Sequence, residues 1–145
     1  MSLKRILMPV DLAYPDVVKK EVDMALKLID EQGVIDMLYV DEARVHRSMV
    51  PTASGSAFSA QHQNAFDSVH TMLEMYVPKA HRGKAIVRNG VVFDEVVLQA
   101  KRSQVDAIVM ASAKPKFRSY FLGSNAAKIV RHSHCSVFVV KDDPA

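Results

Sequence analysis

The residues with the clearest capacity for chemistry form the triplet Gly123-Ser124-Asn125, which stands at the opening of an expected helix. Glycine lets another group approach the backbone closely, and Ser124 or Asn125 can cap the helix by accepting hydrogen bonds from its free amide groups. The same amides can instead hold a phosphate, because a helix N-terminus attracts anions. The triplet by itself leaves both an ordinary cap and a phosphate site open.

Positive charge gathers just before this triplet. Lys114, Lys116 and Arg118 precede it, and no acidic residue lies between Asp106 and Asp142. Cations near the mouth of a helix would complement a polyphosphate, although a basic stretch can also be an ordinary solvated surface. The formal net charge of the whole chain is only +3, which does not by itself indicate a nucleic acid partner.

Asp11 is the second candidate, because it directly follows a buried apolar run that includes Ile6, Leu7, Met8 and Val10. In open α/β sheets, ligands bind beyond the carboxyl ends of the strands. A carboxylate at that point can accept hydrogen bonds from a ribose or a base, and it can equally be an aspartate that only stabilises a loop. Both interpretations remain open from the sequence.

No arrangement of residues predicts catalysis or a protein-held metal. His132 and His134 stand at a helix end, where a cation meets the helix dipole, and His62 and His70 lack acidic partners of fixed geometry. Cys135 precedes an apolar strand, which indicates a buried thiol. Neither a GxxxxGK[ST] loop nor a GxGxxG motif is present. We expect little or no catalytic turnover.

Apolar runs predict strands, and apolar residues spaced three or four apart predict helices. The expected strands cover residues 6–10, 34–40, 84–88, 105–110 and 136–140. The expected helices cover residues 15–32, 63–77, 93–101 and a last one that starts at 121 or 124 and ends at 131. Residues 41–61 have no clean period and predict a long loop.

Particular residues mark the ends of these elements. Pro9 should mark the exit of the first strand, because it can donate no ladder hydrogen bond. Pro15 suits the first position of a helix, and Gly33 suits the position after its end. Met72 and Met75 are expected in the core. Strands that alternate with helices predict a parallel sheet with helices on both faces, and a doubly wound topology fits five strands.

Length and composition predict one domain over residues 1–145, because 145 residues match a typical domain of roughly 150. A single cysteine excludes an internal disulfide framework. No apolar run approaches the roughly 20 residues that a membrane helix needs, and the N-terminus does not read as a secretory signal. These observations favour a cytoplasmic protein.

Several segments together resemble the universal stress protein family over essentially the whole chain. The resemblance rests on residues 5–11 (RILMPVD), 37–41 (MLYVD), 106–112 (DAIVMAS), 120–127 (YFLGSNAA) and 130–140 (VRHSHCSVFVV). The ending is most similar to the short F/G-type bacterial branch of the family, in which a GSN triplet, an RH pair and a CSV strand recur.

The resemblance implies a five-stranded parallel sheet of order 3-2-1-4-5, a homodimer, and ATP bound with Mg²⁺ or Mn²⁺ through the phosphates. Family members that bind ATP carry the pattern G-x2-G-x9-G-[ST]. Gly123-Ser124 matches its final pair, whereas Ala111 and Lys114 stand where the earlier glycines are expected, with one residue fewer in the loop. Alanine is a mild change, and Lys114 adds bulk and charge.

The resemblance also implies roles for individual residues. Asp11 and the backbone of Val40 would meet the adenosine end, in a pocket that Pro9 shapes, and Gly90 could admit the ribose. The remaining residues would lie under or around the phosphates: Met110 and Ala111 beneath the nucleotide, and Gly123, Ser124 and Asn125 at the phosphates. Lys114 is added to this set on its charge alone.

Two functions therefore compete. The first is an ATP-binding stress-response module that signals occupancy to a partner protein. The second is a nucleotide-independent dimeric interaction module with a vestigial site. A kinase-like or ATPase enzyme is a third, and it lacks a Walker lysine and a clear set of acidic metal ligands. The last strand, Ser136 to Val140, is the expected dimer contact, because it is apolar and carries no charge to protect an edge.

Overall fold

The computed structural model describes residues 2–42, 55–112 and 121–141, with the side chains of 55–59 and 121–124 left aside. Its strands are β1 (Arg5–Pro9), β2 (Val34–Asp41), β3 (Arg82–Asn89), β4 (Ala107–Ala111) and β5 (Ser136–Val140). Its helices are α1 (Pro15–Leu28), α3 (Gly55–Tyr76), the short 3-10 helix η1 (Lys79–His81), α4 (Val92–Arg102) and α5 (Phe121–His132).

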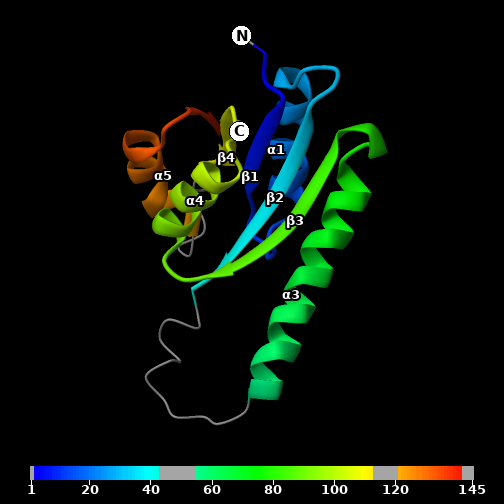
Figure 1. Ribbon diagram of the computed structural model, residues 1–145, viewed down its shortest axis with the longest axis vertical. Helices are drawn as coiled ribbons and strands as arrows, with labels where there is room; N and C mark the ends of the chain where they lie inside the picture. The colour runs from blue at the N-terminus through cyan, green and yellow to red at the C-terminus, as the bar shows by residue number, and fades with distance from the viewer. Residues whose placement is uncertain (1, 43–54, 113–120, 142–145) are drawn as a thin grey trace.

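The strands form one parallel sheet in the order β3-β2-β1-β4-β5, which confirms the predicted doubly wound fold (Figure 1). β1 lies at the centre, with β2 on one side and β4 on the other. β3 and β5 are the two edge strands. The chain reverses its direction of travel across the sheet beside β1, and such a switch point is where open α/β sheets bind ligands.

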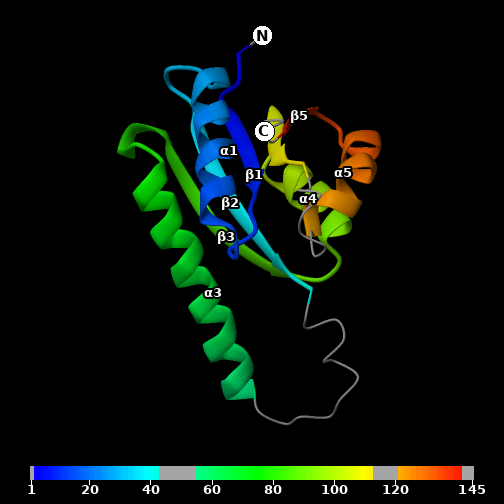
Figure 2. The ribbon, with the colours of Figure 1, turned by 180° about the vertical axis from the view of Figure 1, so that it is seen from behind.

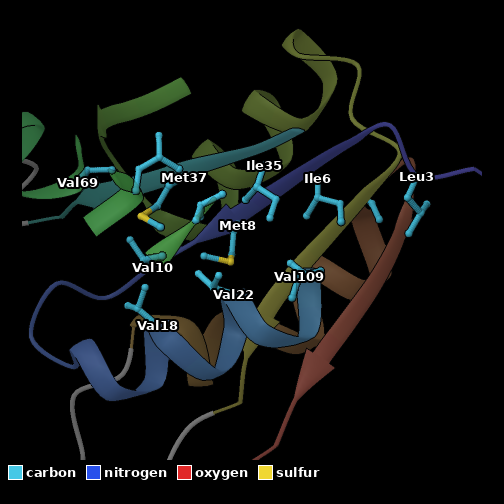
Figure 3. Packing of buried hydrophobic residues seen from close by; sticks show 14 of the residues in the cluster. Leu3, Ile6, Met8, Val10, Val18, Val22, Ile35, Met37, Val69 and Val109 are labelled. Carbon is cyan, nitrogen blue, oxygen red and sulfur yellow. The ribbon is translucent and has the colours of Figure 1, made fainter. Parts of the chain in front are cut away.

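Helices cover both faces of the sheet (Figures 1 and 2). Each face has its own apolar core. One core joins α1 and α3 to the sheet through buried residues such as Val18, Val22 and Val69. The other joins α4 and α5 to the opposite face through Val96 and Ile129. Figure 3 shows the first core, where side chains from α1 meet those of the central strands.

The first helix begins at Pro15 as predicted, but it ends at Leu28 rather than Gln32. The chain leaves the helix early because it must join β2 beside β1: the Asp30 amide donates to the Leu3 carbonyl at 2.9 Å. Gly33 is therefore not the residue after the helix. It lies in a following turn, where its amide donates to the Asp30 carbonyl at 2.8 Å.

The predicted loop over residues 41–61 is wrong in its last part, because α3 already begins at Gly55. Serine and glycine in this stretch have low helix propensity, so local preference did not predict a helix there. The remainder, residues 43–54, lies outside the described residues. α3 is long, and its N-terminal part projects past the sheet in both views (Figures 1 and 2).

The other boundaries differ by a few residues. β3 is longer than predicted and starts at Arg82, and α4 spans Val92 to Arg102. β4 starts at Ala107 rather than Val105, because the Val105 amide still bonds back to the Ala100 carbonyl at 3.2 Å. β1 spans Arg5 to Pro9, one residue earlier at each end than the predicted 6–10, and it ends at the proline expected to mark its exit. β5 spans Ser136 to Val140 as predicted.

The prediction that Met72 and Met75 both lie in the core is wrong for one of them. Met72 packs against the core on the α3 side, whereas Met75 is 68% exposed. Among the described residues, no helix combines the length and the apolar character that crossing a membrane requires.

Candidate functional site

The carboxyl ends of β1, β2 and β4 meet at one side of the sheet and carry most of the predicted site. β1 ends at Pro9, β2 at Asp41 and β4 at Ala111. The Val10 amide continues the pairing by donating to the Leu38 carbonyl at 2.9 Å. Asp11 therefore leaves the sheet between its two neighbouring strands, at the switch point.

Asp11 is half-buried at this point and is held by the turn that follows it. Its Oδ1 accepts a hydrogen bond from the Ala13 amide at 3.0 Å, and its carbonyl accepts one from the Tyr14 amide at 3.1 Å. Among the described residues, Oδ2 accepts none. Burial raises the pKa of Asp11, and the Ala13 N–H opposes that rise. A partly desolvated carboxylate with a spare acceptor can hold a donor from a ligand.

Apolar residues form the floor beside Asp11. Pro9 is buried at the end of β1. Val40 on β2 is 3% exposed, and Met110 and Ala111 on β4 are 0% and 4% exposed. Val40, Met110 and Ala111 belong to one apolar cluster on the face covered by α4 and α5. The structure thus brings these strand-end residues together, although they come from distant parts of the sequence.

The phosphate end of the predicted site is described only in part. α5 begins at Phe121, so Gly123 and Ser124 lie in its first turn and Asn125 in the second. The interpretation of Ser124 or Asn125 as the residue that caps this helix is therefore wrong. Asn125 is only 8% exposed. Lys114 lies outside the described residues, as do Lys116 and Arg118.

Gly90 lies in the turn after β3, and the backbone of this turn requires a glycine. Its φ is +150°, which disfavours other residues, and a Cβ there would lie 3.0 Å from Cγ of Glu95. The Gly90 amide donates to the Asp41 carbonyl at 3.3 Å. Nearby, Oε1 of Glu42 accepts from the Val92 amide at 3.2 Å and so occupies the N-terminus of α4. The turn geometry explains this glycine without a ligand.

Negative charge collects near the carboxyl ends of β1 and β2. Burial raises the pKa of Tyr39, and the charges of Asp41, Asp11 and Glu42 raise it further. The described strand ends here are therefore acidic, and the predicted cations Lys114, Lys116 and Arg118 lie outside the described residues.

The sequence analysis did not single out Glu21, which lies among the buried residues of α1. The structure buries Glu21 completely, on the same stripe as Val18, Val22 and Ala25. Neither of its carboxylate oxygens has a hydrogen-bond partner among the residues that the structure describes. Burial, and then the charge of Asp11, raises the pKa of Glu21 well above its ordinary value. An acidic residue within an apolar stripe was the available sign of this burial.

A second missed group joins three strands. Nη1 of Arg5 on β1 contacts both carboxylate oxygens of Asp36 at 2.7 Å, and Oδ1 of Asp36 also accepts from the Lys84 amide at 2.8 Å. Asp36 is fully buried. Gly83 makes room for this contact, because a Cβ there would lie 2.1 Å from Asp36 Oδ1. The role is structural, because the buried Asp36 carboxylate links β1 to β2 and β3 through these contacts.

Two of the histidines have ring contacts, and the expectation that His70 lacks an acidic partner is wrong, because its Nδ1 lies 3.1 Å from Oε1 of Glu74. The His70 ring stacks on Phe66 with centroids 6.0 Å apart, and the His132 ring lies 5.2 Å from that of Phe93. Cys135 is half-buried, and burial raises the pKa of its thiol. Among the described residues, His, Cys, Asp and Glu form no group of three or more that could hold a metal ion.

Solved structures of the same fold include nucleotide complexes. The hypothetical protein MJ0577 superposes with a TM-score of 0.77 at 19% identity, covering 100% of both chains. An Arabidopsis thaliana universal stress protein family protein with AMP bound gives 0.61 at 22% identity, covering 97% of this chain and 93% of that one. A universal stress protein in complex with cAMP gives 0.60 at 13% identity, covering 97% and 98%.

The sequence comparisons are more specific than the comparison of folds. The model of the universal stress protein family matches residues 2–141. Universal stress protein G of Shigella flexneri is 32% identical over 140 residues, covering 95% of this chain and 99% of the relative. The Salmonella typhimurium protein of the same name is 31% identical over 140 residues, with the same coverage. With the family model matching nearly its full length and the doubly wound sheet in place, the chain belongs to the universal stress protein family.

Proposed function

We propose that this universal stress protein binds an adenine nucleotide at the carboxyl ends of β1, β2 and β4, and that ATP with Mg²⁺ or Mn²⁺ is the form it takes. The observation that carries the proposal is Asp11, a half-buried carboxylate at the switch point with one oxygen that accepts no hydrogen bond among the described residues. The AMP and cAMP complexes of proteins with this fold support adenine as the ligand class.

Each part of the site has a distinct task in this proposal. Asp11 accepts hydrogen bonds from the ribose or the base, and the Val40 backbone meets the adenosine end. Pro9, Met110 and Ala111 provide an apolar floor that keeps water from beneath the nucleotide. The phosphates lie at the N-terminus of α5, where the first four amides of a helix lack intrahelical partners.

The residues that hold the phosphates follow from that placement. Gly123 and Ser124 lie in the first turn of α5, Asn125 follows them, and Lys114 precedes them in the sequence. The metal ion supplies charge neutralisation at the phosphates when it is bound. No general base occupies a recognised motif in this chain, so we expect occupancy rather than turnover to be the output.

The first test is mass spectrometry of the purified, denatured protein for co-released nucleotide, followed by calorimetric titration of nucleotide-free protein with ATP, AMP and cAMP. Gly123→Val should abolish binding, because it places a side chain where the backbone approaches phosphate. Asp11→Ala should weaken binding by about tenfold to a hundredfold, the usual range for a hydrogen bond to a charged group.

The control for Asp11 is Asp23→Asn, an exposed acidic residue of α1 that lies away from the strand ends. Circular dichroism shows whether each variant is folded. If nucleotide-free protein binds none of the three nucleotides, the site is vestigial and the protein is an interaction module. Undiminished ATP affinity in folded Gly123→Val protein would place the nucleotide elsewhere.

We also propose that the protein is a homodimer through β5, which would serve either function. β5 is an edge strand, and its four apolar residues are only half-buried. Val137 and Val139 pack on the α5 side, while Phe138 and Val140 pack on the α1 side. A two-fold axis beside this strand would pair its free backbone groups and cover both rows.

Val139→Lys tests this contact by placing two like charges close together across the axis. Sedimentation velocity should show wild-type dimer and a shift toward monomer in the variant. Val130→Lys is the matched control, because Val130 is 52% exposed on α5 and its change should leave the dimer intact. Wild-type protein that sediments as a monomer at tens of micromolar would exclude β5 as the interface.

A further inference from the structure

A groove with a volume of about 480 Å³ runs along β3, the edge of the sheet opposite β5. His62 and Phe66 of α3 form one wall, and the five consecutive β3 residues 84–88 form the other. β2 separates this groove from the switch point at β1. The groove is therefore a different surface from the proposed nucleotide site and from β5.

The groove exposes the edge of β3 rather than one face of it. Successive residues of a strand point to opposite faces of the sheet, and the two apolar clusters show this alternation here. Ala85 and Val87 pack on the α3 side, whereas Ile86 packs on the α4 side. A groove that touches residues from both faces must follow the backbone itself, where an edge strand presents unpaired N–H and C=O groups.

Two hydrogen bonds show which backbone groups face outward. The Leu38 carbonyl faces β1, because it accepts from the Val10 amide at 2.9 Å, and its partner Ile86 on β3 therefore faces β2. Backbone groups alternate in direction along a strand, so Ala85 and Val87 direct theirs away from the sheet. In agreement, the Val87 carbonyl accepts from Nη1 of its neighbour Arg88 at 3.1 Å. Two residues spaced in this way are what an added strand pairs with.

Within the described part of the chain, the two charged side chains that line the groove are both basic. Lys84 is exposed, and Arg88 is half-buried. No acidic side chain lines the groove among the described residues. A second copy of β3 would bring these cations against their equivalents, and like charges opposite one another destabilise a strand pair. An acidic occupant would be attracted instead.

We propose that β3 accepts an extended, acidic segment of a partner protein as an additional strand of the sheet. Backbone groups of Ala85 and Val87 pair with that segment, and the side chains that line the groove select its side chains. Acidic side chains on one face of the segment meet Lys84 and Arg88. Apolar side chains on the other face meet Phe66. This mode of recognition takes affinity from the main chain and specificity from alternate side chains.

The probe is a six-residue peptide, capped at both ends, that alternates glutamate and valine, and its control alternates lysine and valine. Titration of ¹⁵N-labelled full-length protein should give saturable shifts of the β3 amides with the glutamate peptide, in the millimolar range or tighter. The lysine peptide should give none. Added salt should weaken the interaction, because it depends on charge.

Two variants separate charge from backbone pairing. The double variant Lys84→Glu, Arg88→Glu should lower the affinity by about tenfold or more, while Lys19→Glu, a matched change at an exposed position of α1, should not. Ala85→Pro removes one outward N–H and retains the charges, and an edge strand tolerates proline at such a position. It should also abolish the shifts in protein that remains folded by circular dichroism.

Several results would overturn the proposal. These are the absence of saturable shifts, equal binding of the two peptides, or shifts confined to elements other than β3 and α3. Binding that persists in folded Ala85→Pro protein would also reject strand addition. Self-association of wild-type protein that Lys84→Glu, Arg88→Glu changes, without any peptide, would make a second copy the occupant.

Discussion

Replacing Glu21 by methionine should make the protein more stable. The native structure buries this carboxyl group completely, and within the described part of the chain neither of its oxygens has a hydrogen-bond partner. A buried polar group in that state costs about 1–3 kcal/mol. Methionine is also straight-chained and a good helix former, and it adapts to irregular space. We expect Glu21→Met to raise the free energy of unfolding by about 1–3 kcal/mol for this reason.

The stabilisation should grow as the pH rises. Burial, and then the negative charge of Asp11, raises the pKa of Glu21 well above its ordinary value of 4.5. Below pH 4.5 both states hold the proton, whereas above it the unfolded chain releases a proton that the native protein keeps. Native stability therefore falls by up to about 1.4 kcal/mol per pH unit until the native pKa is passed. The methionine variant lacks this loss.

Urea unfolding followed by circular dichroism, from about pH 5 to about pH 8, measures both effects. Glu21→Gln separates them, because the amide cannot ionise but remains polar and unpartnered. It should show the flatter pH profile with less of the added stability. Asp23→Asn, an exposed acidic residue of the same helix, is the control and should change the free energy of unfolding by no more than about 0.5 kcal/mol.

The refuting result is specific. If both Glu21 variants follow the wild-type pH profile, Glu21 does not titrate abnormally and is not buried without a partner. A methionine variant that is destabilised by overpacking would leave the pH profile of Glu21→Gln to decide. Parallel curves for wild type and Glu21→Gln over the whole range would therefore refute the reasoning on their own.

Three further outcomes follow from described contacts. Arg5→Met should lower the free energy of unfolding by about 3 kcal/mol, the lower end for a broken buried pair, because it leaves the buried Asp36 carboxylate without its cation; chemical denaturation measures this. Gly83→Ala should cost about 1–3 kcal/mol in the same assay, since its Cβ would lie 2.7 Å from the Ile35 carbonyl oxygen, and a variant as stable as wild type would disprove the contact. Cys135 should react with iodoacetamide more slowly than a free thiol at neutral pH, because burial raises its pKa, and mass spectrometry follows the alkylation.

Local sequence pattern determined the class of fold and most of its elements. Apolar runs and stripes depend only on neighbours along the chain, so they predicted five strands separated by helices. Pro9 and Pro15 set boundaries through their own covalent geometry, and the structure places the end of β1 and the start of α1 there. The same local rules failed at Gly55, where the long α3 continues through residues of poor helix propensity.

The sequence predicted the site only in outline. The rule that ligands bind at strand ends selected Asp11, and the family resemblance added Val40, Met110 and Ala111. The fold brings these positions to one side of the sheet. The role of Asn125 as a cap was wrong, because the first residue of α5 depends on how the preceding chain approaches the helix. No periodicity contains that information.

Tertiary structure alone decided the polar groups inside the protein. Glu21 lies on the apolar stripe of α1, and only the packing of that helix against the sheet shows that its side chain is fully buried. Asp36 contacts Arg5, which is 31 residues away in the chain, and the Lys84 amide, which is 48 residues away. The groove along β3 also requires α3 beside a free edge. Burial and pairing are set by which strands become neighbours, and that order arises from crossovers between segments far apart in the sequence.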